Sequence, residues 1–331
     1  MAQPARNTET HSRRTTMLRT AFCPVVRAAL EDQRIIEIMA NPDGSIWLEQ
    51  VGLGLRVSDE NLSADDRERV IRLVASSIGE SVNSNSPIVS AELPEGGERF
   101  EGLLPPVSMQ PCFSIRKPAT SPLSLQDYVE QGSIAPPVSD ALQTSIHARE
   151  NILIAGGTSS GKTTFANALL DNDGLAHDRV VILEDTRELN CQNANKVQLR
   201  TRGDEVSLRD LVRSTLRLRP DRIIVGEVRG PEALDLLKAW NTGHPGGLTT
   251  LHANSALGAL RRLEQLALEA TPRMPHELIA EAINVIVFMS RENGVRRVTE
   301  AIRVLGFNGE TYDTEPLAGR SLSLIQQGAS Q

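Results

Sequence analysis

The segment "GGTSSGKTTFANALL", residues 156–170, constrains the fold of this chain more than any other feature. Its Gly156, Gly161, Lys162 and Thr163 fit the pattern G-x-x-x-x-G-K-[ST] of a phosphate-binding loop. The apolar run "NILIAG" precedes the loop and good helix formers follow it, which is the strand–loop–helix context that the motif requires. Glycines let successive backbone N–H groups point inward, and the helix N-terminus adds partial positive charge. The segment therefore predicts an α/β fold that binds the phosphates of a nucleoside triphosphate.

Two side chains of the loop have expected roles of their own. Lys162 would place its charge near the β and γ phosphates, and the Thr163 hydroxyl would ligate Mg²⁺. The residues expected to contact the nucleotide are Gly157, Thr158, Ser159, Ser160, Gly161, Lys162, Thr163 and Thr164. The loop alone leaves open whether the chain hydrolyses the nucleotide, transfers its phosphate or acts as a motor.

Strand-like and helix-like patterns alternate from residue 124 onward. The apolar runs at 179–185 and 222–228 predict strands, and so do "GGLTTLHA", "NVIVFMS" and "VTEAIRVL". A helix capped by Ser207 lies between the first two runs, and a helix with Pro231 in its first turn follows them. Buried strands that alternate with helices indicate a largely parallel sheet. We assign residues 124–331 to this domain and expect its last 25 residues to be weakly ordered.

A smaller α+β domain is expected at residues 17–115. The turn cluster at 41–44 lies between two apolar runs and predicts a hairpin, and Ser63 is placed to cap a helix. The segment 116–123, rich in Pro, Ser and Thr, is the expected linker. The polar residues 1–16 lack the apolar core of a signal peptide and are expected to form a disordered tail.

Two carboxylates follow apolar runs directly, which places them at the ends of predicted strands. Glu184 ends "VVILE" and Glu227 ends "IIVGE", and in a parallel sheet both ends open on the crevice where ligands bind. Nucleotide hydrolysis needs a group that orients water. We predict Glu184 as the base or water-orienting group and Glu227 as the residue that holds Mg²⁺ through water, with the exchanged assignment left open. Gly226 stands where phosphate-loop ATPases often carry a metal-holding Asp.

The segment "NTGHPGGLTTLHANS" contains His244 and His252. The H-x₇-H spacing does not match a metal site. One interpretation is that each histidine has an ordinary structural role. The other is a sensor of the γ-phosphate at the end of a strand beside Glu227.

Arginines fall into two groups. Arg209, Arg213 and Arg217 lie four residues apart, so they form one helix stripe that is either a solvated face or a face between subunits. Arg99 and Arg116 are isolated cations near the linker. Each is either part of a surface ion pair or a finger that stabilises transition-state charge on the phosphates.

Composition excludes several classes of protein. The net charge of −7 and an aromatic content of 3% argue against a protein that coats nucleic acid, so no direct nucleic-acid binding is expected. The widely spaced Cys23, Cys112 and Cys191 form neither a metal spacing nor an even disulfide set, which favours a cytoplasmic location. No apolar run approaches the roughly 20 residues that span a bilayer.

Taken together, these segments resemble the type II/IV secretion ATPase family, most closely its conjugal-transfer branch, the TrbB-like ATPases. The blocks "NILIAGGTSSGKTT", "VVILEDTREL" and "RPDRIIVGEVRGPEALDLLKAWNTGHPGGLTTLHANS" carry the resemblance, together with "NPDGSIWLE" and "PPVSMQPCFSIRKP" upstream. It extends over about residues 17–305.

The resemblance implies a RecA-like ATPase domain that follows a smaller N-terminal domain, with ATP and Mg²⁺ bound between them. It also implies a homohexamer in the cytoplasm, peripheral to the inner membrane, that energises a type IV secretion or mating apparatus. Its motifs fall on Gly156 to Thr164 (Walker A), Glu184, Asp185 and Glu188 (Asp-rich box), Glu227 (Walker B), His244 and His252 (His box), and Arg99 and Arg116.

Three rival functions stay open on the sequence alone. A small-molecule kinase would need an acceptor-binding lid, and no lid-like insertion stands out. A DNA translocase would be stimulated by single-stranded DNA, which the acidic balance disfavours. A nucleotide-regulated scaffold would lack steady hydrolysis.

Overall fold

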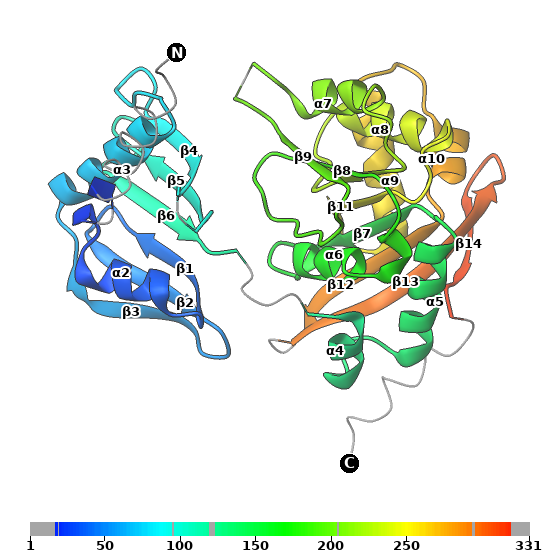
Figure 1. The fold of residues 1–331 in the computed structure, drawn as a ribbon, viewed down its shortest axis with the longest axis horizontal. Helices are drawn as coiled ribbons and strands as arrows, with labels where there is room; N and C mark the ends of the chain where they lie inside the picture. The colour runs from blue at the N-terminus through cyan, green and yellow to red at the C-terminus, as the bar shows by residue number, and fades with distance from the viewer. Residues whose placement is uncertain are drawn as a thin grey trace. The chain divides into compact units, whose positions relative to one another are not determined.

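The computed structural model describes residues 17–18, 20–94, 96–118, 123–203, 205–292 and 295–318. The chain divides into two compact units, Met1–Thr120 and Ser121–Gln331 (Figure 1). The boundary falls inside the segment 116–123 that the sequence predicts as a linker. The predicted tail at 1–16 lies outside the described residues.

The N-terminal unit is an antiparallel sheet with helices packed on it. The strand order is β3-β2-β1-β6-β5-β4. Its elements are α2 (Pro24–Glu31), β1 (Ile35–Ala40), β2 (Ser45–Gln50), β3 (Gly54–Asn61), α3 (Ala64–Ser77), β4 (Ile88–Glu92), β5 (Arg99–Leu103) and β6 (Cys112–Arg116). Buried residues of α2, α3 and the strands, Val26, Val70, Ile38 and Phe100 among them, form its core.

Local chemistry explains two of these elements as the sequence predicts. Gly44 has φ +94° in the turn between β1 and β2, a conformation that glycine adopts without steric cost. The side chain of Ser63 accepts a hydrogen bond from the Asp66 backbone N–H and so caps α3. The predicted hairpin and the predicted capped helix are both confirmed.

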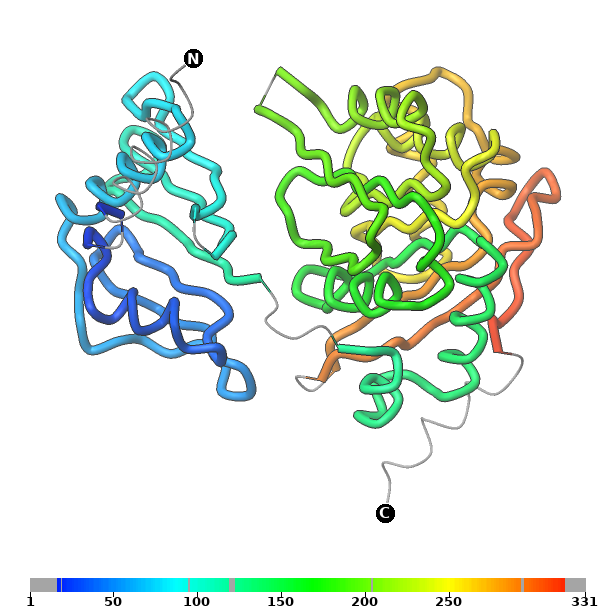
Figure 2. The backbone as a smooth tube through the Cα atoms, viewed as in Figure 1, coloured from blue at the N-terminus to red at the C-terminus, as the bar shows by residue number. Residues whose placement is uncertain are grey.

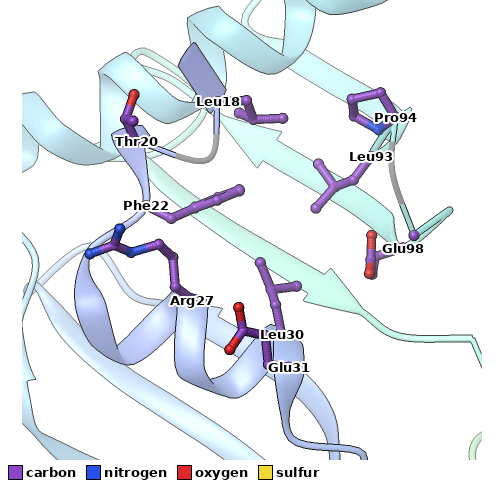
Figure 3. A pocket seen from close by; sticks show the side chains of 10 residues that line it. Leu18, Thr20, Phe22, Arg27, Leu30, Glu31, Leu93, Pro94 and Glu98 are labelled. Carbon is purple, nitrogen blue, oxygen red and sulfur yellow. The ribbon is translucent and has the colours of Figure 1, made fainter. Parts of the chain in front are cut away.

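A cavity of about 460 Å³ lies in the N-terminal unit (Figure 3). Leu18, Phe22, Leu30 and Leu93 give it an apolar lining, and Arg27 lies at its polar side. None of the residues that the sequence predicts as site residues lines this cavity.

The C-terminal unit is built on a mixed sheet with the order β14-β13-β12-β7-β11-β10-β8-β9. Strands β12, β7, β11, β10, β8 and β9 run parallel, and β13 and β14 join antiparallel at one edge. The strands are β7 (Ile152–Gly156), β8 (Val180–Glu184), β9 (Lys196–Arg200), β10 (Arg222–Val225), β11 (Leu248–His252), β12 (Val285–Glu292), β13 (Val295–Phe307) and β14 (Tyr312–Pro316). The helices are α4 (Leu125–Glu130), α5 (Pro136–His147), α6 (Lys162–Leu170), α7 (Leu208–Thr215), α8 (Glu232–Asn241), α9 (Ala256–Leu268) and α10 (His276–Ala282), with a 3-10 turn η1 (Asp173–Leu175).

Helices cover both faces of this sheet (Figure 1). Leu153 of β7 packs with α7 to α10 on one face, whereas Ile152 and Ile154 pack with α4 to α6 on the other. This alternation with period two is the pattern of a strand buried on both sides. The predicted α/β architecture of a RecA-like domain is therefore confirmed.

Two features of the sheet go beyond the sequence analysis. The sequence patterns do not predict β9, whose residues are exposed or half-buried, as suits an edge strand. β14 pairs with β13 inside the segment expected to be weakly ordered, so that expectation is wrong for residues 312–316. Residues 319–331 lie outside the described part of the chain.

A buried ion pair joins β10 to the loop before β8. Arg222 Nε lies 2.6 Å from Asp178 Oδ2, and the two side chains are 3% and 5% exposed. Arg222 Nη2 also donates to the carbonyl oxygens of Ile146 and Gly174, at 2.9 Å each. Hydrogen bonds of this kind make a buried charge tolerable.

The two tryptophans of the chain lie in different units. Trp47 of β2 is 36% exposed, whereas Trp240 of α8 is 3% exposed. Trp240 Nε1 donates to the Ile223 carbonyl at 3.0 Å. A Cβ at Gly247 would lie 2.1 Å from the Trp240 ring, so only glycine fits there.

Among the helices within the described ranges, none has the length and apolar character needed to cross a membrane.

Candidate nucleotide site

The phosphate loop connects β7 to α6, as the sequence predicts. Ser159 has φ +59° and Gly161 has φ +95°, so the backbone turns through left-handed conformations before α6 begins at Lys162. Within the part of the chain described, no side chain caps this helix. Its first N–H groups therefore remain available to an anion, and the helix dipole favours negative charge there.

Lys162 holds the loop together. Its ammonium donates to the Gly156 and Gly157 carbonyl oxygens at 3.1 and 3.0 Å. The side chain is buried. A buried ammonium is costly unless polar groups surround it. The two carbonyl oxygens compensate the charge here, and phosphate oxygens would compensate it when a nucleotide binds.

His252 ends β11, the strand between β7 and β10, and is paired in register with Gly156. Its Nδ1 lies 3.4 Å from Lys162 Nζ, and its Nε2 lies 2.9 Å from Glu227 Oε1. Burial lowers the pKa of His252, and the charges of Lys162 and Arg229 lower it further, whereas Glu227 opposes the shift. The predicted placement of His252 in a strand beside Glu227 is confirmed, and its role as a phosphate sensor stays a prediction.

Glu227 follows β10 and lies next to the loop through His252. Arg229 Nη2 donates to Glu227 Oε2, and Arg229 also lies 3.9 Å from Asp185. The hydrogen bond to Glu227 is the main cause of the raised pKa of Arg229. Lys162, His252 and Glu227 thus form a continuous row across the ends of β7, β11 and β10, which we call the Lys–His–Glu row.

Glu184 ends β8 but makes different contacts. Its Oε1 accepts hydrogen bonds from the backbone N–H groups of Glu188 and Leu189 at 2.9 and 2.8 Å, and the side chain is 3% exposed. These bonds fix the loop after β8. A Cβ at Gly226 would lie 3.0 Å from Glu184 Cγ, so the close approach of Glu184 favours glycine at this position. The assignment of Glu184 as base stays a prediction, and its contacts with backbone N–H groups favour Glu227 for that role instead.

Other predicted residues have separate surroundings. His244 Nδ1 lies 3.2 Å from the Ala239 carbonyl at the end of α8, which is a structural contact. Arg99 and Arg116 pair in register on β5 and β6 of the N-terminal unit. Arg209 and Arg213 both bind Asp235 of α8, whereas Arg217 is exposed beyond α7.

A groove of about 470 Å³ adjoins the loop in the C-terminal unit. Gly157 and Thr158 form one side, His252 and Asn254 lie at the end of β11, and α9 contributes a polar side. The α9 residues are Arg261, Arg262 and Gln265. Neither these two arginines nor Arg229 is among the site residues predicted from sequence, although "LHANSALGALRR" places two cations on the helix directly after His252.

The residues present fit a triphosphate and Mg²⁺. A Cβ at Gly157 would meet nothing within 4 Å, so the backbone is open to a ligand there. Within the described ranges, no three His, Cys, Asp or Glu residues form a metal site by themselves. Mg²⁺ often binds one or two protein oxygens and completes its shell with phosphates and water, and Thr163 and Glu227 supply oxygens of that type.

Comparisons with known proteins agree with this geometry. The type II/IV secretion system protein family matches residues 21–298. A probable conjugal transfer protein TrbB of Sinorhizobium fredii is 47% identical over 307 residues, covering 92% of this chain and 94% of that protein. A type IV secretion system protein VirB11 of Bartonella quintana is 30% identical over 325 residues, covering 83% and 90%.

Solved structures support the fold. The ATPase DotB of Legionella pneumophila has a TM-score of 0.59 at 23% identity, covering 87% of this chain and 82% of that chain. From the match over most of its length, this chain belongs to the type II/IV secretion system protein family.

Proposed function

We propose that this chain is the ATP-hydrolysing motor subunit that energises a type IV secretion or conjugal-transfer apparatus. The chain is an ATPase, as its membership of the type II/IV secretion system protein family indicates. The observation that carries the proposal is the Lys–His–Glu row, since it joins the phosphate loop to a strand-end carboxylate inside one rigid sheet.

Each member of the row has a task that follows from its position. Lys162 stabilises the negative charge of the β and γ phosphates, because its ammonium lies at the loop and can exchange carbonyl contacts for phosphate oxygens. His252 lies between this cation and Glu227, so a change at the terminal phosphate reaches the carboxylate through one imidazole. Thr163 and Glu227 would hold Mg²⁺, which neutralises phosphate charge when bound.

The water-orienting group is one of two carboxylates. Glu227 is held by Arg229 and His252 at the crevice, with 17% of its side chain exposed. Glu184 is more deeply buried and binds backbone N–H groups. We infer that Glu227 orients the water as well as helping to hold Mg²⁺, and that Glu184 fixes the loop after β8, so Glu227 takes the role that the sequence assigned to Glu184.

Assembly and partners follow from the family and remain part of the proposal. We infer a homohexamer that acts in the cytoplasm, peripheral to the inner membrane, with other proteins of the secretion or mating apparatus as partners. Arg99 and Arg116 lie side by side on β5 and β6, and each also lies opposite a glutamate of the neighbouring strand. We propose that one of them contacts the nucleotide and couples phosphate release to movement of the N-terminal unit.

A phosphate-release assay tests the proposal. The wild-type chain is expected to release phosphate from Mg·ATP without an acceptor, and Lys162→Ala to lose at least about 99% of the rate, as expected when a charged phosphate contact is removed. Lys238→Ala is the matched control, since Lys238 is an exposed lysine of α8. Absence of steady hydrolysis in the wild type would contradict the motor.

Further measurements separate the rivals. Mass in solution, with and without a non-hydrolysable ATP analogue, tests the hexamer. Stimulation of hydrolysis several-fold by single-stranded DNA would favour a translocase instead. Release of phosphate only when an acceptor is present would favour a kinase.

A further inference from the structure

The hairpin formed by β12 and β13, drawn in orange in Figure 2, has an irregular register beside the phosphate loop. Phe288 pairs with Glu300, but the next residue, Met289, pairs with Val298. Thr299 is therefore an extra residue in β13, which makes this a β-bulge. Met289 also pairs with Gly156, so the bulge lies at the level of the loop.

The bulge decides which arginine faces the loop. Val298 and Ala301 are three residues apart, yet both belong to the core on the α4–α6 face. Regular alternation from Ala301 would place Arg297 on that face. The extra Thr299 reverses the alternation, so Arg296 shares the face of Val298, and Arg297 points to the opposite face.

Arg296 consequently lies against the phosphate loop. Its Cδ is so close to Gly161 that a Cβ on this glycine would lie 2.9 Å away. Its charge also reaches α4. Burial raises the pKa of Tyr128 in α4 to about 12, and the positive charge of Arg296 opposes that rise. The Tyr128 ring contacts Phe165 of α6, so Arg296 lies near the start of α6 and close enough to α4 for its charge to act there.

The surroundings of Arg296 are positive, and its side chain is partly buried. Across the described ranges of the chain, no carboxylate forms an ion pair with its guanidinium. Arg291 is its direct cross-strand partner, and the N-terminus of α6 with Lys162 lies beside it. Like charges opposite one another are unfavourable, and an anion bound beside the start of α6 would offset this repulsion.

We propose that Arg296 contacts the phosphates of the bound nucleotide, in addition to Lys162 and to the arginine proposed from the N-terminal unit. Arg296 belongs to the same subunit as the phosphate loop. The proposal rests on the proposed function, because the anion is the nucleotide of that site. Within the C-terminal unit, it adds a residue from the β12–β13 hairpin to the contributions of the loop and of the strand ends of β10 and β11. The β-bulge at Thr299 then determines that Arg296 lies on the face of the sheet beside the phosphate loop.

Titration of the full-length chain with a fluorescent ADP analogue and Mg²⁺ tests this contact without relying on hydrolysis. The variants are Arg296→Gln, Arg296→Lys and, as the matched control on the opposite face of the same strand, Arg297→Gln. We expect Arg296→Gln to weaken ADP binding about tenfold, the size of one charge-assisted hydrogen bond. Arg296→Lys should keep affinity within about threefold of wild type, since it keeps the charge, and Arg297→Gln should leave it unchanged.

The outcomes are distinct. Wild-type affinity in Arg296→Gln, or an equal loss in Arg297→Gln, overturns the proposal and leaves the proposed function intact. Failure of the wild-type chain to bind ADP overturns the proposed function itself. The melting temperature of each variant without nucleotide shows whether it is folded, and if Arg296→Gln is not folded, a tenfold loss in a folded Arg296→Lys decides against a charge contact.

Discussion

The Nε2 atom of His252 lies 2.9 Å from Oε1 of Glu227, and this contact links the end of β11 to the end of β10. The other ring nitrogen faces Lys162. A neutral imidazole that carries its proton on Nε2 can accept from the ammonium through Nδ1 while its N–H side faces the carboxylate. A protonated ring would instead place a second positive charge beside Lys162. The protonation state of His252 therefore decides whether the row is intact.

Stability should depend on pH through His252. Its folded pKa is lowered from 6.5, so the unfolded chain binds the proton more readily. The contribution of His252 to stability is therefore complete above pH 6.5 and is lost as the pH falls from 6.5 through the lowered folded pKa. Urea unfolding at about pH 7.5 and 5.5 should show a larger loss for the wild type than for His252→Gln. Equal losses would show that His252 does not titrate in this way.

The two strand-end carboxylates should respond differently to amide substitution. Glu227→Gln removes the charge held by Arg229 and His252, so kcat for ATP should fall at least about 100-fold with ADP affinity retained. Glu184→Gln keeps an oxygen that can accept from the Glu188 and Leu189 N–H groups, and the rate should fall less than about tenfold. The reverse order of the two effects would restore Glu184 as the base.

The buried Asp178–Arg222 pair should carry far more stability than the more exposed pairs on Asp235. Asp178→Ala leaves the Arg222 guanidinium uncompensated in the interior, which costs about 3–5 kcal/mol. Asp235→Ala removes contacts to Arg209 and Arg213, which are 33% and 53% exposed, and should cost about 1 kcal/mol or less. The free energy of unfolding in urea measures both, and similar losses would refute the distinction.

Gly226 should be intolerant of even one methyl group. A Cβ there would lie 3.0 Å from Glu184 Cγ, so Gly226→Ala should push Glu184 off the backbone amides it holds and cost about 1–3 kcal/mol. Gly306→Ala is the control, since a Cβ at Gly306 meets nothing within 4 Å. Unfolding in urea provides the comparison, and equal stability of the two variants would show that Glu184 moves freely.

Local patterns predicted much of the fold because their causes are local. The turn at 41–44, the Ser63 and Ser207 caps and the phosphate loop each depend on residues a few positions apart. The strand order does not: β11 lies between β7 and β10 through contacts distant in sequence. The sequence therefore placed Glu227 and His252 correctly at strand ends, but could not show that His252 is the residue that touches Lys162.

Arg229 and Arg296 were missed for related reasons. Arg229 contacts two carboxylates that follow different strands, Glu227 after β10 and Asp185 after β8. Its role therefore depends on the strand order, which the sequence does not show. Arg296 faces the loop only because the bulge at Thr299 reverses the alternation of β13. Periodicity read from sequence assumes a regular strand, so it would assign Arg297 to that face.

The separate environments of Trp47 and Trp240 give the intact chain two natural reporters. The partly exposed Trp47 should emit fluorescence at a longer wavelength than Trp240, which is buried beside Gly247. With Trp47→Phe, the remaining fluorescence would follow denaturation of the nucleotide-binding unit alone, and with Trp240→Phe it would follow the N-terminal unit. Independent melting of the two halves could thus be observed without cutting the polypeptide.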